Sequence, residues 1–150
     1  MRQKLPMILI RVIVGLVFLT EGVLKFLHPQ ELGAGRFAAI GLPAPQVLAP
    51  LIGMVEIVAG AAVLLNLFAG EAALLLLIVI SVAIVSTKIP ILLGHRVGPF
   101  ALAKLPRYGL LSFLHEARTD LSMLFGALAI LIDSGLQMGR RRQWYQPKGR

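Results

Sequence analysis

Residues 72–87 read AALLLLIVISVAIVST and contain no charged side chain, and this stretch decides the fold. With its flanks it forms an apolar segment over 71–93, of about 23 residues, whereas a helix of about 20 residues crosses the hydrocarbon core of a bilayer. Segments of similar length and character cover 5–27, 46–68 and 116–138. The sequence therefore predicts an all-α integral membrane protein, a four-helix bundle formed by a single domain over residues 1–138.

Composition supports a membrane protein and excludes most water-soluble classes. Apolar residues make up 57% of the 150 residues and charged residues 15%, against about 45–50% and about 25% in soluble domains. Mean hydropathy is +0.84. A cleaved signal peptide is not expected, because Arg11 interrupts the first apolar segment and no small-residue cleavage site follows. With no cysteine, the chain cannot supply thiol or disulfide redox chemistry.

The connections between the segments differ in length and character. Residues 66–70 allow only a tight antiparallel hairpin. Within 28–45, Phe37 and Ile40 beside Arg36 indicate a short helix at the membrane interface. Residues 94–115 form the longest link, which is too apolar for a free loop and is expected to lie on the membrane or to re-enter the bundle. Pro90 is expected to kink the last turn of the third segment.

The net charge of +8 indicates topology rather than nucleic-acid binding, because the basic residues flank the apolar segments. Four spans place both termini on one side of the membrane. Seven basic residues lie in the terminal segments and six in the links on the opposite side. This difference is too small to decide which side of the membrane the termini occupy. The Arg140–Arg142 run after the last segment favours cytoplasmic termini, with 139–150 as a basic cytoplasmic tail, in a bacterial inner membrane.

Two stripes of small and charged residues on the first two segments are predicted to face each other. At about 100° per residue, each set shares one helix face. The first stripe is Arg11, Gly15, Phe18, Gly22 and Lys25, and the second is Ala49, Gly53, Glu56 and Gly60. Small residues allow two membrane helices to approach closely. Glu56 would then lie near mid-membrane, with Arg11 on one side and Lys25 on the other as its candidate cations.

A second group of charged residues is predicted at one end of the bundle. It comprises Glu21, Lys25, Lys88, His115, Glu116, Arg118 and Asp120. Glu116 and Asp120 share a helix face, and carboxylates in a first helical turn are favoured by the helix dipole. Helix capping and fixing of helix register are therefore open explanations, beside a ligand site or proton pathway. Adjacent His115 and Glu116 point about 100° apart on a helix, so no metal site is predicted.

The order of these residues resembles the DoxX family of small bacterial membrane proteins. The resemblance rests on Arg11, Gly15, Gly22 and Lys25-Phe26, then Phe37 and Ile40-Gly41-Leu42-Pro43, then Glu56 and Gly60, and on His115 to Asp120 before Met123. It covers about residues 8–136. The chain departs from many relatives at Asp133-Ser134-Gly135-Leu136-Gln137, where they carry a Gly-rich turn and a Ser-Leu-Asp sequence.

The resemblance implies a four-helix protein of the inner membrane associated with oxidoreductase systems that handle quinone, sulfur or redox stress. The leading hypothesis is therefore a non-catalytic membrane subunit that holds a quinone or docks an oxidoreductase partner. A small-solute or proton-coupled carrier is the second hypothesis. A structural or assembly protein without a ligand is the third. Apart from quinone, no cofactor is indicated, and a homo-oligomer remains open.

Overall fold

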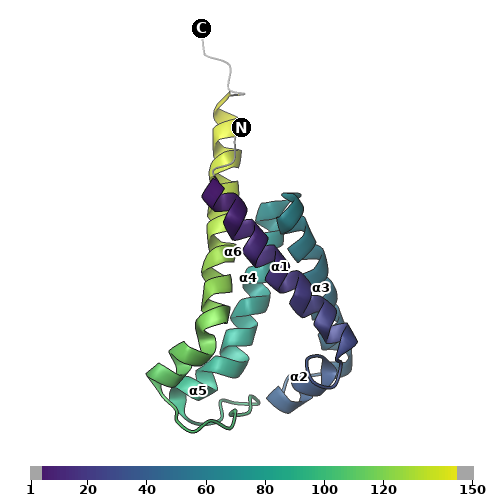
Figure 1. Ribbon diagram of the computed structural model, residues 1–150, viewed down its shortest axis with the longest axis vertical. Helices are drawn as coiled ribbons and strands as arrows, with labels where there is room; N and C mark the ends of the chain where they lie inside the picture. The colour runs from purple at the N-terminus through teal and green to yellow at the C-terminus, as the bar shows by residue number, and fades with distance from the viewer. Residues whose placement is uncertain (1–4, 145–150) are drawn as a thin grey trace.

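The computed structural model describes the backbone of residues 5–144 and the side chains of residues 5–135. All secondary-structure elements assigned within these residues are helices, which confirms the all-α prediction. In chain order the elements are α1 (Leu5–Leu27), α2 (Ala34–Ile40), α3 (Pro45–Leu65), α4 (Ala69–Ala83), the π-helical turn η1 (Ile84–Lys88), α5 (Ile89–Leu93) and α6 (Leu110–Trp144). Figure 1 shows α1 crossing in front of the other long helices, and α6 extending beyond them toward the C-terminus.

Among the described residues, three helical stretches are long and apolar enough to cross a membrane: Leu5–Leu27, Pro45–Leu65 and Ala69–Leu93. They correspond to the first three predicted segments. The second of these stretches, α3, ends three residues earlier than predicted because Asn66 (φ 55°) and Phe68 (φ 48°) adopt left-handed backbone conformations. Residues 66–68 thereby turn the chain directly from α3 into α4, as the predicted hairpin requires.

The third stretch contains the π-helical turn η1, which ends two residues before Pro90. Pro90 has no N–H to donate to the carbonyl four residues earlier, and its ring crowds that carbonyl. A π-turn widens the helix locally and relieves such a mismatch. The side chains of Ser86 and Thr87 donate hydrogen bonds to the carbonyl oxygens of Val82 (2.8 Å) and Ala83 (2.7 Å), respectively. The distortion expected at Pro90 thus takes the form of η1.

The last helix begins at Leu110, six residues before the predicted boundary at 116. The boundary prediction was wrong because Gly109, at φ 104°, ends the link. Its N–H donates to the carbonyl of Ile91, and its own carbonyl accepts from Phe113. The remaining link is tied to α2, since Ala101 N donates to Ile40 O at 2.8 Å. Backbone hydrogen bonds therefore hold the link to α5 and to α2.

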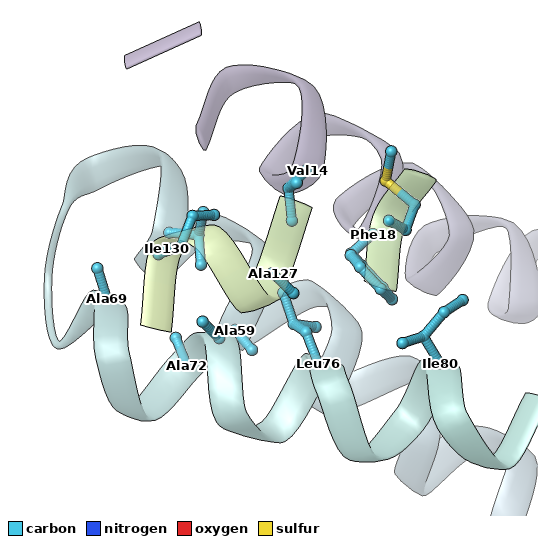
Figure 2. Packing of buried hydrophobic residues seen from close by; sticks show 12 residues of the cluster. Val14, Phe18, Ala59, Ala69, Ala72, Leu76, Ile80, Ala127 and Ile130 are labelled. Carbon is cyan, nitrogen blue, oxygen red and sulfur yellow. The ribbon is translucent and has the colours of Figure 1, made fainter. Parts of the chain in front are cut away.

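The core is built from small and branched side chains of four helices (Figure 2). Val14 and Phe18 of α1 pack with Leu76 of α4 and Ala127 and Ile130 of α6. The most extensive helix pairs are α1 with α3 and α4 with α6, and α3 packs on α4. Large apolar side chains remain exposed on the outside of the bundle. This exposed surface suits lipid rather than water.

Candidate functional site

Close backbone contact between α1 and α3 positions the first charged group. A Cβ added to Gly15 would lie 2.8 Å from the carbonyl oxygen of Gly60, and one added to Gly22 would lie 2.6 Å from that of Gly53. Real side chains do not tolerate such separations. The prediction that the two glycine stripes face each other is therefore confirmed, and the pairing places Glu56 between the helices.

Lys25 is the cation that meets Glu56. Lys25 Nζ lies 2.6 Å from Glu56 Oε2 and 3.8 Å from Glu21 Oε2. Glu56 is 4% exposed. The contact is a short ion pair, although Oε2 makes no hydrogen bond of good geometry. The predicted pairing with Lys25 is found, and Glu21 is a second carboxylate near the same ammonium.

The prediction that Arg11 also flanks Glu56 was wrong. Arg11 Nη2 instead lies 3.4 Å from Asp133 Oδ2 on α6. Side chains on a helix lean toward its N-terminus. Because α1 and α3 are antiparallel, Lys25 and Glu56 lean toward each other. Arg11 leans away from Glu56, toward the end of the bundle where α6 carries Asp133.

Asp133 is therefore a charged partner that the sequence reasoning did not place in the site. Arg11 is 3% exposed, and its Nε and Nη1 donate no hydrogen bond. A sequence signal did exist. Arg11 lies six residues after the start of the first predicted segment, and Asp133 lies five residues before the end of the last, so the two are at similar depth.

A second ion pair joins η1 to α6. Lys88 Nζ lies 3.3 Å from Asp120 Oδ2, with both side chains largely buried. Because α6 begins at Leu110, Asp120 lies in its third turn and Glu116 in its second. The favourable helix-dipole effect fades within the first turn. Capping therefore does not explain these two carboxylates.

A hollow of about 330 Å³ opens beside this pair, and we call it the charged hollow. Its lining comes from α2, η1, α5, the link and α6: Arg36, Ala39, Ile40, Thr87, Lys88, Ile91, Ala101, Leu102, Ala103 and Glu116. Within the described side chains, Arg36 and Glu116 form no ion pair or hydrogen bond. Arg36 was not among the predicted site residues. Its position between apolar residues of the predicted interfacial helix was the available signal.

The remaining predicted residues do not join one network. Arg118 Nη1 donates to the carbonyl oxygen of His115, and both residues are exposed. Among the described side chains, no ion pair or hydrogen bond connects the Lys25–Glu56 pair with the Lys88–Asp120 pair. The predicted single cluster is thus divided between two helix pairs. Over that part of the chain, no three His, Asp or Glu side chains gather as they would around a metal ion.

A second hollow of about 400 Å³ lies on the outside of α3 and α4. Its walls are almost wholly apolar, with Met54, Val58, Phe68 and Leu75 among them. It offers no convergent polar groups. The charged hollow is therefore the better candidate for recognising a polar ligand.

Comparisons with known proteins agree with a membrane protein. A family model described as DoxX matches residues 7–89. An uncharacterised membrane protein from Mycobacterium tuberculosis (strain ATCC 25618 / H37Rv) is 49% identical over 124 residues, which cover 83% of this chain and 72% of that protein. No solved structure matches the chain.

Proposed function

Because this chain belongs to the DoxX family of membrane proteins, we propose that it is the membrane subunit of an oxidoreductase system and holds a quinone in the charged hollow. In this proposal α6 supplies the fourth span and α2 lies at the membrane interface. At about 1.5 Å per residue, the 35 residues of α6 extend further than a bilayer's hydrocarbon core. Both termini are cytoplasmic, so the charged hollow opens at the other face of the inner membrane.

The observation that carries the proposal is the composition of the charged hollow. A quinone site needs apolar walls and a few convergent polar groups. Ile40, Ile91 and Leu102 provide apolar wall, while Arg36 and Lys88 can donate hydrogen bonds to the ring oxygens. Glu116 can accept a hydrogen bond from a hydroxyl of the reduced form. When bound, the quinone accepts electrons and protons from a partner enzyme, and the residues named here bind and orient its ring.

Co-purification tests this proposal directly. The chain is purified in mild detergent from its native membranes, its lipids are extracted, and quinone per protein is measured from the absorbance spectrum. We expect retained quinone in the wild type and a several-fold loss in Arg36→Gln. Lys104→Gln, which changes an exposed basic residue of the link outside the hollow lining, serves as the matched control. Quinone no more abundant than in an unrelated membrane protein purified alongside would refute the proposal.

A proton-coupled carrier is the second candidate, and the buried Lys25–Glu56 pair favours it. Ionisable residues inside membrane spans mark ion and substrate pathways in transporters. Reconstitution into proteoliposomes with an internal pH indicator tests this candidate. A carrier predicts proton flux that Glu56→Gln abolishes, while the exposed Glu71→Gln leaves it unchanged. Absence of flux above protein-free vesicles excludes the carrier.

A further inference from the structure

The sides of α1 and α6 that touch in one half of the bundle are uncovered in the other half. Val14 is 1% exposed, and a Cβ added to Gly126 of α6 would lie 2.5 Å from its Cγ2. At about 100° per residue, Glu21 lies about 20° from Val14 around α1, and Ser122 lies about 40° from Gly126 around α6. Both Glu21 and Ser122 are exposed, because α1 moves away from α6 toward its C-terminal end (Figure 1). Two helix sides are therefore left uncovered within one chain.

Opposite charges flank these uncovered sides at the same level of the bundle. Glu21 comes from α1, where its side chain is 48% exposed, and the exposed Arg118 comes from α6. The two helices are antiparallel (Figure 1). Counted from the contact between Val14 and Gly126, Glu21 lies about 10 Å further along α1, and Arg118 lies about 12 Å back along α6. The two charged residues therefore lie at similar depths.

These two charges do not meet within one chain. Among the described side chains, no ion pair joins Glu21 to Arg118. Lys25 Nζ is 3.8 Å from Glu21 Oε2 but only 2.6 Å from Glu56 Oε2, so one ammonium group serves two carboxylates. Arg118 Nη1 donates to the carbonyl oxygen of His115, one turn earlier in its own helix. Because a charge exposed to the membrane interior is costly, Glu21 and Arg118 would each be stabilised by an opposite charge at the same depth.

A second copy of the chain supplies these charges when a two-fold axis runs along the membrane normal. Both copies then cross the membrane in the same direction, so every residue keeps its depth. A contact made across such an axis is made twice, with the two residues exchanged between the copies. Glu21 and Arg118 meet this condition because their depths match. Two glutamates and two arginines come to one level, and their charges balance.

The exposed side of α6 that presents Arg118 also supplies apolar packing surface. Leu111, Phe125 and Ile132 lie at seven-residue spacings from Arg118, within about 40° of it around the helix. Their exposed fractions are 82%, 62% and 54%. Parallel helices pack through side chains that recur at this spacing, and one charged residue among them sets register and partner. This side of α6 is therefore suited to a parallel contact with its own copy.

We propose that the chain forms a two-fold homodimer in the membrane, in which α6 of each subunit packs against the uncovered sides of α1 and α6 of the other. Glu21 of each subunit pairs with Arg118 of the partner subunit, and the two reciprocal pairs fix the depth of the contact. The exposed apolar side chains of α6 supply the packing. This inference does not rest on quinone binding in the charged hollow.

Disulfide cross-linking in native membranes tests the contact, because the chain has no natural cysteine. Phe125→Cys places a thiol on the proposed interface. Val58→Cys is the matched control, since Val58 is similarly exposed, at 64%, but lies on α3. After mild oxidation we expect position 125 to give a several-fold higher yield of linked dimer than position 58. Equal yields, or linkage of position 125 to a different protein in place of a second copy, would overturn the inference.

Charge reversal tests the proposed ion pair. In the Phe125→Cys chain, Glu21→Arg and Arg118→Glu should each lower the dimer yield about tenfold or more, because like charges then meet. When these two variants are co-expressed with different tags, a mixed dimer should form at nearly the original yield, since opposite charges face each other again. Glu71→Arg, at the exposed start of α4, should leave the yield unchanged.

The mixed dimer separates a contact between chains from one within a chain. A pair within one chain would be broken in both variants, and mixing them would not restore it. A mixed yield as low as that of either variant alone therefore overturns the inference. If a charge-reversal variant does not accumulate, the comparison of positions 125 and 58 in otherwise wild-type chains still decides.

Discussion

At the scale of single residues, the direction in which a side chain leans decides which charges meet. Lys25 and Arg11 are both basic residues on the Glu56 side of α1, and each is about two helical turns from the level of Glu56. Only Lys25 leans toward the middle of the membrane, because helical side chains lean toward the N-terminus. It forms the 2.6 Å pair, whereas Arg11 pairs with Asp133. To predict which charged side chains form an ion pair, the spacing along the helix has to be combined with the direction in which each side chain leans.

Removing Lys25 should destabilise the chain strongly. Lys25→Met leaves Glu56 buried without its cation, and breaking one partner of a buried pair costs about 3–5 kcal/mol. Adding Glu56→Gln should recover most of that loss, because the uncompensated charge disappears. Equilibrium unfolding in detergent, followed by circular dichroism, measures both. Lys104→Met on the exposed link should have little effect. A double variant as unstable as Lys25→Met alone would contradict this account.

At the scale of elements, glycines set the distance between α1 and α3. Gly15 and Gly22 approach the carbonyl oxygens of Gly60 and Gly53 so closely that no Cβ fits. The short separation brings Lys25 and Glu56 into contact. In the third span, Pro90 is preceded by the π-turn η1. Lys88 ends that turn and faces α6, where it pairs with Asp120.

A methyl group at Gly22 should separate α1 from α3. Gly22→Ala places a Cβ 2.6 Å from the carbonyl oxygen of Gly53, and overpacking of this kind costs typically about 1–3 kcal/mol. Gly135→Ala is the matched control, since nothing lies within 4 Å of its added Cβ. It should be neutral or slightly stabilising, because alanine favours a helix over glycine by up to about 1 kcal/mol. Similar unfolding free energies for the two variants would argue against the close helix contact.

Replacing Pro90 should weaken the contact between η1 and α6. Pro90→Ala restores the missing N–H, so the π-turn can revert to α-helix and rotate Lys88 relative to Asp120. The coupling between these residues is measured by a double-mutant cycle with Lys88→Met and Asp120→Asn. We expect the coupling energy to fall in the Pro90→Ala background. An unchanged coupling would show that the turn does not position Lys88.

At the scale of the whole molecule, the charged hollow exists only because distant segments meet. Arg36 comes from α2, Lys88 from η1 and Glu116 from α6. The link between α5 and α6 closes one wall and is held to α2 through Ala101 and Ile40. No one segment of the sequence contains the site.

The proposed topology is testable because the chain has no natural cysteine. Lys104→Cys in the link and Gln143→Cys near the C-terminus each provide one labelling position. With cytoplasmic termini and four spans, a membrane-impermeant maleimide should label position 104 in intact spheroplasts. It should label position 143 only after the membrane is permeabilised. Labelling of both positions in intact spheroplasts would place the link and the C-terminal end of α6 on the same outer side of the membrane, and α6 would then not be the fourth span.

The membrane helices of this protein and the contact between α1 and α3 can be predicted from the sequence alone. Uninterrupted apolar length predicts membrane helices, because the bilayer must be crossed with every backbone group satisfied. Helical periodicity placed the glycine stripes of α1 and α3 opposite each other. The tertiary structure decided the rest: the partner of Arg11, the start of α6 at Leu110, and the presence of Arg36 in the charged hollow. Periodicity specifies which face a residue occupies, whereas partners depend on helix orientation, side-chain lean and contacts between segments far apart in the chain.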